Sequence, residues 1–297
     1  MGGYEMHPKE DIVIGFIGTG VMGKSMASHL LKAGYPLYVY TRTQKKAKEL
    51  LDQGANWATT PKEIAERANV IITIVGYPSD VEEVYLGKDG LVTNGHENTC
   101  LIDMTTSTPS LAEKIYQEAK KKGMFALDAP VSGGDIGARE ARLAIMVGGD
   151  QEAFNHVKPV LDVMGSNIVL QGKAGAGQHT KMCNQIAIAS NMLGVMEAVV
   201  YAEKAGLNPE NVLKTITTGA AGSWSLSNLA PRVIKGDFEP GFMIKHFIKD
   251  MGIALEEAEK MGLDMPGLAL AQSLYKKLAE DGLSDRGTQA LYKYWNQ

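Results

Sequence analysis

The sequence predicts an α/β protein in which a mostly parallel sheet covered by helices is followed by an all-helical domain. Two observations predict this arrangement. Short apolar runs alternate with helical patterns over the first part of the chain, as expected when parallel strands are joined by crossover helices. After about Gly172 the strand-like runs stop, and helical periodicity continues to the end of the chain.

The first predicted strand covers Ile12 to Ile17, a nearly continuous apolar run typical of a strand that is buried on both faces. A helix follows it and ends near Gly34. Further strands are predicted over PLYVYT (36–41), VIITIV (70–75), TCLIDMT (99–105), MFALDAPV (124–131) and LAIMVGG (143–149), and helices over KKAKELLDQG (45–54), LAEKIYQEAKKKG (111–123) and EAFNHVKPVLDVMG (152–165).

The change of pattern near Gly172 predicts a domain boundary, with residues 11–173 binding a nucleotide and residues 174–297 binding substrate and forming oligomer contacts. One long helix is expected over Gln178 to Ala205, beginning beside the first domain and entering the second. The later helices are predicted over Pro209–Thr217, Ser227–Lys235, Ile244–Met261, Leu268–Glu280 and Gln289–Tyr294.

Composition is typical of a globular protein, because 44% of the 297 residues are hydrophobic and 22% are charged. The net charge of -4 gives no general attraction for nucleic acid or an anionic membrane. No apolar run approaches the roughly 18 residues of a membrane span, so we expect a cytoplasmic protein with a disordered leader over Met1 to Glu10. The cysteines, Cys100 and Cys183, lack metal-ligand spacing and are expected to be buried, reduced thiols, so no metal site is predicted.

The first strand leads directly into the glycine-rich segment GTGVMG, which has the G-x-G-x-x-G spacing of a dinucleotide-binding turn. In a Rossmann-type domain, the first glycine allows the tight turn, the second lets the backbone approach a pyrophosphate, and the third permits close packing of helix on strand. A structural turn is the alternative, but the strand before and the helix after favour a nucleotide site. The expected cofactor-binding residues here are Gly18, Gly20, Val21, Met22 and Gly23.

The end of the second strand indicates which dinucleotide is bound. A chain that selects NAD usually carries Asp or Glu there, whereas this chain has Thr41, Arg42 and Thr43, with Lys45 and Lys46 close behind. Arg42 can pair with a 2′-phosphate in a forked geometry, so NADP is favoured and NAD stays possible. The alternative is a solvated basic start of a helix.

Two further segments fit a small carboxylate. Ser132, Gly133 and Gly134 can form a concave run of backbone N–H donors beside a hydroxyl, although a plain glycine-rich turn fits the spacing equally well. Thr106 follows another strand, at the carboxyl edge of the sheet where ligands of open α/β sheets collect.

Lys181 lies near the start of the long helix, and Asn184 and Gln185 share its face at the i+3 and i+4 positions. If this amine is partly desolvated, it loses some preference for its charged form and can exchange a proton near neutral pH. His179 is turned away from that face and is expected to be incidental. Lys249 and Asp250, in a later helix, form either part of the site or a surface charge pair.

The chain resembles the β-hydroxyacid dehydrogenases, the group that contains 3-hydroxyisobutyrate dehydrogenase, tartronate semialdehyde reductase and the glyoxylate/succinic semialdehyde reductases. The resemblance covers nearly the whole chain and rests on four motifs in order: GFIGTGVMG, DAPVSGG, GAGQHTKMCNQ and KDMGIAL. It implies an active site between the two domains. It further implies Lys181 as the catalytic acid/base, Ser132, Gly133 and Gly134 at the substrate carboxylate, Asn184 and Gln185 near the substrate, and Thr106, Phe242, Lys249 and Asp250 lining the cofactor or substrate site.

Two departures from the family pattern affect the pocket near the lysine. Many members carry a second asparagine where this chain has Gln185, and His179 and Thr180 replace commoner small residues. The segment TRT is similar to the NRT of several relatives, whose cofactor preference is not uniform.

The expected reaction is reversible hydride transfer between the nicotinamide and a small hydroxy acid or semialdehyde acid, with Lys181 delivering the proton. The alternatives are a 6-phosphogluconate dehydrogenase-like or imine-reducing enzyme and a nucleotide-binding protein without chemistry. A 6-phosphogluconate dehydrogenase usually has His-Asn after the lysine, where Cys183-Asn184-Gln185 stands here, and imine reductases generally place another residue at the lysine position. A homodimer or homotetramer is expected.

Overall fold

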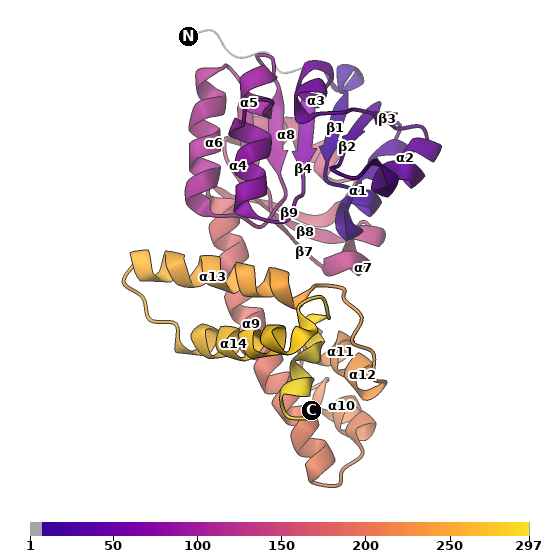
Figure 1. Ribbon diagram of the computed structural model, residues 1–297, viewed down its shortest axis with the longest axis vertical. Coiled ribbons are helices and arrows are strands. Elements are labelled where there is room, and N and C mark those ends of the chain that lie inside the picture. The colour runs from indigo at the N-terminus through magenta and orange to yellow at the C-terminus, as the bar shows by residue number, and fades with distance from the viewer. Residues whose placement is uncertain (1–7, 297) are drawn as a thin grey trace. The chain divides into compact units, whose positions relative to one another are not determined.

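The computed structural model describes residues 8–296 (Figure 1). Most of the leader predicted over Met1 to Glu10 lies outside the described residues, although Lys9–Asp11 form a short 3-10 helix. The chain divides into two compact units, of which unit 1 ends at Lys181 and unit 2 begins at Met182. The expected fold class, a mostly parallel sheet domain followed by a helical domain, is confirmed. The domain boundary near residue 173 stays a prediction.

Unit 1 is built on one sheet, to which the described residues contribute nine strands in the order β3-β2-β1-β4-β5-β6-β8-β7, with β9 paired to β8. The strands are β1 (Ile14–Ile17), β2 (Leu37–Tyr40), β3 (Asn56–Trp57), β4 (Val70–Thr73), β5 (Cys100–Asp103), β6 (Phe125–Asp128), β7 (Val131–Ser132), β8 (Leu143–Gly148) and β9 (Gly165–Gly172). The neighbouring pairs from β3 to β6 are all parallel. Their order, β3-β2-β1-β4-β5-β6 with β1 near the centre, is that of a dinucleotide-binding sheet.

Both faces of this sheet are covered, as the apolar strands require. Along β4, Ile72 packs into the core on one face and Ile71 into the core on the other, because successive side chains alternate. The first core includes residues of α1 and α8, and the second includes residues of α3, α4 and α6. The helices of unit 1 are α1 (Val21–Lys32), α2 (Lys48–Asp52), α3 (Pro61–Arg67), α4 (Pro78–Leu86), α5 (Leu91–Asn94), α6 (Pro109–Lys121), α7 (Gly134–Arg139) and α8 (Gln151–Leu161).

The strands predicted from the sequence differ from the observed strands at one edge of the sheet. The predicted strand over residues 124–131 is two strands, β6 and β7, which are interrupted at Ala129 and Pro130. Both run antiparallel to β8 in one register, with Asp128 opposite Gly148 and Val131 opposite Ile145. Strand β9 was not predicted at all. It pairs in parallel with β8, but most of its residues are exposed, so it lacks the apolar run on which the prediction relied.

Unit 2 is helical, and its core is formed by residues of α9, α10, α11, α12, α13 and α14. The helices are α9 (Ala176–Lys204), which begins in unit 1, α10 (Pro209–Ile216), α11 (Trp224–Asn228), α12 (Ala230–Ile234), α13 (Ile244–Lys260) and α14 (Pro266–Leu278), followed by a π-helix (Ala279–Leu283) and a 3-10 helix (Thr288–Tyr294). One predicted helix, Ser227–Lys235, is instead the end of α11 followed by α12. Pro231 lies in the first turn of α12, where its missing N–H costs no hydrogen bond.

One expectation about a single residue was wrong. Cys100 is buried as expected, but Cys183, in α9, is exposed. Within residues 8–296, one helix, α9, passes a length and composition test for a membrane span, with a mean hydropathy of 1.3 over its most apolar 18-residue window. This is weak support for a membrane segment, since 44% of that window is buried and core helices pass the same test.

Candidate active site

The glycine-rich turn joins β1 to α1, as predicted. Gly18 has a φ of +101°, which favours glycine, and its N–H donates to the Tyr40 carbonyl at 3.0 Å. A Cβ at Gly18 would collide with the Ile74 carbonyl oxygen, and a Cβ at Gly23 would collide with the Gly18 carbonyl oxygen. These two glycines therefore let the turn close against β4 and bring α1 close to the strand.

Gly20 differs from both, because a Cβ placed there would meet nothing within 4 Å. It is exposed and is the N-cap of α1, with an extended backbone (φ -71°, ψ -164°). The N–H groups of Val21, Met22 and Gly23 open the helix and have no acceptor within it. Open space beside free N–H groups at the positive end of a helix fits the pyrophosphate of a dinucleotide.

The segment after β2 carries the predicted phosphate-binding side chains. Arg42 is 81% exposed at its side chain, and its Nη1 lies 3.3 Å from Asp80 Oδ1 of α4. Thr43 is also exposed, and Thr41 is half-buried. The guanidinium is thus held only by a weak surface ion pair, which an incoming 2′-phosphate can replace.

Lys181 is buried in the second turn of α9, with 7% of its surface exposed. Its Nζ donates to the Val131 carbonyl oxygen at 2.8 Å. Val131 directly precedes Ser132, so the structure brings the predicted acid/base next to the predicted carboxylate segment. In that segment Gly133 and Gly134 have φ values of +131° and +62°, and α7 begins at Gly134.

Two side chains that sequence reasoning missed fix the first turn of α9. Asp128, at the end of β6, accepts hydrogen bonds from the N–H groups of Gly175 and Gln178. Gln178 in turn bonds to the backbone on both sides of Thr106, which is half-buried after β5. A signal was present, since Asp128 opens the motif DAPVSGG and Gln178 lies one helical turn before Lys181 in GAGQHTK.

The remaining predicted residues belong to unit 2, and four of them form one network. Gln185 accepts a hydrogen bond from Asn184 at 2.8 Å and donates to Asp250 Oδ2 at 2.8 Å. Lys249 Nζ lies 3.0 Å from Asp250 Oδ1, and the two side chains are 13% and 3% exposed. This pair is therefore buried, and its interpretation as a surface charge pair is wrong. Phe242 lies outside the network and packs against Phe247, with ring centroids 5.5 Å apart.

A buried carboxylate, Asp103, lies at the end of β5 beneath the Thr106 segment. Its Oδ1 accepts hydrogen bonds from the Thr73 hydroxyl at 2.9 Å and the Thr105 N–H at 3.0 Å. Burial raises the pKa of Asp103 to about 6, the hydrogen bonds from Thr105 and Thr73 oppose this rise, and the charge of Asp128 adds to it. Burial also raises the pKa of Asp128.

This carboxylate predicts a pH dependence of stability. Because the pKa of Asp103 is higher in the folded state than its ordinary value of 3.8, the folded protein binds more protons than the unfolded chain between about pH 4 and pH 6. The free energy of unfolding should therefore fall as pH rises through this window, with a contribution from Asp103 of at most about 3 kcal/mol. Asp103→Asn should remove that contribution, measured as the difference between denaturant unfolding curves of the two proteins at each pH.

The matched control is Asp89→Asn, at an exposed aspartate of the same unit. It should leave the pH dependence of unfolding as it is in the unmodified protein. If Asp103→Asn gives the same curve of stability against pH as this control, the raised pKa of Asp103 is wrong.

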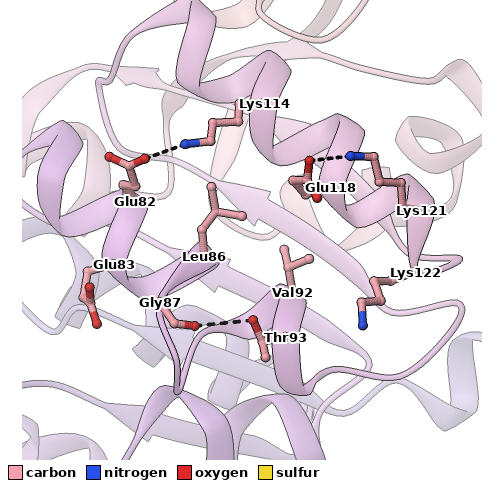
Figure 2. Close-up of a pocket in the computed structure, with 10 residues that line it drawn as sticks. All are labelled: Glu82, Glu83, Leu86, Gly87, Val92, Thr93, Lys114, Glu118, Lys121 and Lys122. Atoms are coloured by element: carbon pink, nitrogen blue, oxygen red, sulfur yellow. Dashed lines mark hydrogen bonds and ion pairs between the residues drawn. The ribbon is translucent and has the colours of Figure 1, made fainter.

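A surface pocket of about 520 Å³ lies elsewhere in unit 1, between α4, α5 and α6 (Figure 2). It is lined by Glu82, Glu83, Leu86, Gly87, Val92, Thr93, Lys114, Glu118, Lys121 and Lys122. None of these is a predicted site residue. Two of its lysines are already paired, Lys114 with Glu82 at 2.7 Å and Lys121 with Glu118 at 2.6 Å, so we assign no ligand to this pocket.

Comparison with protein families agrees with this geometry. Residues 13–172 match the NAD binding domain of 6-phosphogluconate dehydrogenase, and residues 175–295 match the NAD-binding domain of NADP-dependent 3-hydroxyisobutyrate dehydrogenase. The chain belongs to the β-hydroxyacid dehydrogenase family. The two matches together span nearly all of the described residues, as the resemblance of the four motifs implied.

Individual relatives match this chain over most of its length. The chain is 67% identical to an uncharacterized oxidoreductase of Bacillus subtilis, over 95% of this chain and 98% of that protein. It is 51% identical to the protein named probable 3-hydroxyisobutyrate dehydrogenase-like 1, mitochondrial, of Arabidopsis thaliana, over 94% and 83% of the two chains. The solved structure of Mycobacterium tuberculosis 3-hydroxyisobutyrate dehydrogenase with L-serine is 31% identical, with a TM-score of 0.87 over 96% of this chain and 99% of that one.

This β-hydroxyacid dehydrogenase family member is an NAD(P)-dependent oxidoreductase that acts on CH–OH groups of small hydroxy acids. The expectation of an enzyme with a nicotinamide cofactor is thereby confirmed, and the alternative of a nucleotide-binding protein without chemistry loses its support. The roles of single residues, Lys181 among them, stay predictions.

Proposed function

We propose that the protein interconverts a small hydroxy acid and the corresponding semialdehyde acid, with NADP as the preferred cofactor and Lys181 as the acid/base. The observation that carries this proposal is the placement of Lys181. Its buried Nζ lies 2.8 Å from the carbonyl oxygen of Val131, directly before the Ser132 to Gly134 segment. A buried ammonium group next to a run of backbone donors suits a substrate that carries both a carboxylate and a carbonyl.

A bound nicotinamide cofactor would supply or accept the hydride, while residues of the protein bind and orient the substrate and stabilise its charge. The Ser132 hydroxyl and the backbone of Gly133 and Gly134 hold the carboxylate. Lys181 stabilises the negative charge that develops on the carbonyl oxygen, and then transfers a proton from Nζ to that oxygen. In the oxidising direction, the neutral amine accepts the proton of the substrate hydroxyl. Asn184 orients the substrate from the next turn of α9.

A panel of substrates tests this function directly. Reduction of glyoxylate, succinic semialdehyde and tartronate semialdehyde, and oxidation of 3-hydroxyisobutyrate and L-serine, is followed by nicotinamide absorbance with each of the two cofactors. We expect turnover of at least one small acid, and none of 6-phosphogluconate or a cyclic imine. If only 6-phosphogluconate or the imine turns over, the proposed substrate class is wrong.

Cofactor choice is predicted to depend on Arg42. A charge-assisted hydrogen bond contributes about 1.5–3 kcal/mol, so Arg42→Ala should weaken NADPH binding by roughly 10-fold to 100-fold and leave NADH binding nearly unchanged. Fluorescence titration of each reduced cofactor measures both constants. The control is Lys48→Ala, a nearby exposed lysine paired with Asp52, which should change neither. Equal losses for NADPH and NADH in Arg42→Ala would show that Arg42 does not read the 2′-phosphate.

We also propose that the protein acts in the cytoplasm as a homodimer or homotetramer, without nucleic acid or membrane partners. The net charge of -4 supports the absence of polyanion binding. Exposed apolar side chains of unit 2, such as Tyr201 and Trp224, support contact with a second copy. Sedimentation equilibrium at several protein concentrations tests the assembly, and a monomer at all of them would contradict it.

A further inference from the structure

Gln178 is a fully buried side chain in the first turn of α9, and both ends of its amide are used. Its Oε1 accepts a hydrogen bond from the Ser107 N–H at 2.9 Å, and its Nε2 donates to the Thr105 carbonyl oxygen at 2.7 Å. The amide oxygen of Gln178 thus meets a backbone donor, and its amide nitrogen meets a backbone acceptor. The glutamine amide supplies both groups without carrying a charge at any pH.

The two partners of Gln178 stand on either side of Thr106. Because the carbonyl of residue 105 and the N–H of residue 107 are both held, the backbone that carries Thr106 is fixed before and after that residue. The same segment is held from the other side, where the Thr105 hydroxyl accepts the Val75 N–H at 2.9 Å. The position of Thr106 in unit 1 is therefore tied directly to the first turn of α9.

That first turn is itself held by Asp128. One carboxylate oxygen accepts the Gly175 N–H at 2.8 Å and the other accepts the Gln178 N–H at 2.9 Å, so a side chain from β6 caps the positive end of α9. The fit is tight. A Cβ at Gly148 would lie 2.6 Å from Asp128 Oδ1, and a Cβ at Gly177 would lie 2.8 Å from Asp128 Oδ2. The turn can hardly shift without breaking these contacts.

Lys181 follows Gln178 by one helical turn, and its own Nζ is bonded to Val131. We propose that Gln178 is a positioning residue, which links the Thr106 segment to the turn of α9 that carries Lys181 and so fixes where the amine meets the substrate. This inference rests on the proposed function of Lys181. It assigns a role to a residue that need not touch substrate, cofactor or reacting atoms.

Two substitutions separate the hydrogen bonds of Gln178 from its bulk. Gln178→Met keeps the length and the apolar stem but makes neither bond. Gln178→Glu makes both bonds only when its carboxyl group is protonated, because an ionised carboxylate has no proton to donate to the Thr105 carbonyl oxygen. If Gln178 is a positioning residue, the kcat of Gln178→Glu should fall as its carboxyl group loses its proton. The unmodified protein should not show this additional pH dependence.

The experiment measures kcat, KM and cofactor binding from acidic to alkaline pH for the unmodified protein, both Gln178 variants, Lys181→Ala and the control Gln151→Met, an exposed glutamine in α8. We expect Gln178→Met to lower kcat by roughly 10-fold to 100-fold at all pH values, with cofactor binding nearly unchanged. In Gln178→Glu, kcat should approach the unmodified value at acidic pH and fall as pH rises. Gln151→Met should have no effect.

A measurement without substrate accompanies these rates. Amide hydrogen exchange at Ser107, whose N–H loses its acceptor, should be faster in Gln178→Met than in the unmodified protein. Should Gln178→Met fail to fold, the pH profile of Gln178→Glu decides alone. A profile parallel to that of the unmodified protein overturns the inference, as do unchanged kcat in both variants and unchanged exchange at Ser107. Full activity of Lys181→Ala would instead overturn the proposed function, so the two failures are distinguishable.

Discussion

Lys181→Ala is expected to lower kcat by roughly 100-fold to 10,000-fold, the usual contribution of a positioned general acid or base. The substitution removes the only group that the proposed mechanism uses to neutralise the carbonyl oxygen and to protonate it. Cofactor affinity should change little, because the glycine-rich turn and Arg42 lie on other elements of unit 1. Steady-state kinetics with the best substrate of the panel and fluorescence titration of NADPH measure the two effects.

Two further variants show whether the amine itself matters. Lys181→Met keeps the length of the side chain without its charge, and Lys181→Arg keeps a charge that does not release its proton. Both should be nearly as impaired as Lys181→Ala. Lys204→Ala, at an exposed lysine in the last turn of the same helix, is the control and should behave as the unmodified protein. Near-normal turnover in both Lys181→Ala and Lys181→Arg would refute the role of this amine.

Gly20→Ala is expected to weaken binding of the cofactor by about 10-fold or more while leaving stability nearly unchanged. A methyl group at Gly20 meets no protein atom within 4 Å, and the extended backbone there accepts any residue, so the folded protein tolerates it. The same methyl group projects into the space where a pyrophosphate approaches the start of α1. Calorimetric titration of NADPH and thermal unfolding in its absence measure the two effects.

Gly23→Ala provides the contrast. Its Cβ would collide with the Gly18 carbonyl oxygen and lie 2.9 Å from Ile74, so α1 must move away from the strand. This variant should lose stability by a few kcal/mol, as expected for a small-to-large change in a packed site. If Gly20→Ala binds NADPH as tightly as the unmodified protein, the open space beside Gly20 does not receive the phosphates.

The main strands and several of the helices could be read from the sequence because they leave local patterns. Apolar runs such as VIITIV predict buried strands, and the spacing of Gly18, Gly20 and Gly23 predicts a dinucleotide turn, since each signal is contained within a few consecutive residues. Strand β9 was not predicted, because the prediction depends on such local patterns. Its pairing with β8 is real, but its exposed residues leave no local apolar pattern.

For the candidate site, the sequence by itself determined the fold class, the glycine-rich turn and the side chains available for chemistry. Only the tertiary structure decided which of them meet. The bonds of Asp128 and Gln178 join residues 47, 50, 71 and 73 positions apart, and the bond from Lys181 to Val131 spans 50 positions. Such contacts depend on how β5, β6 and α9 converge at one edge of the sheet. No local periodicity reports that convergence, because it is a property of the folded chain and not of any one segment.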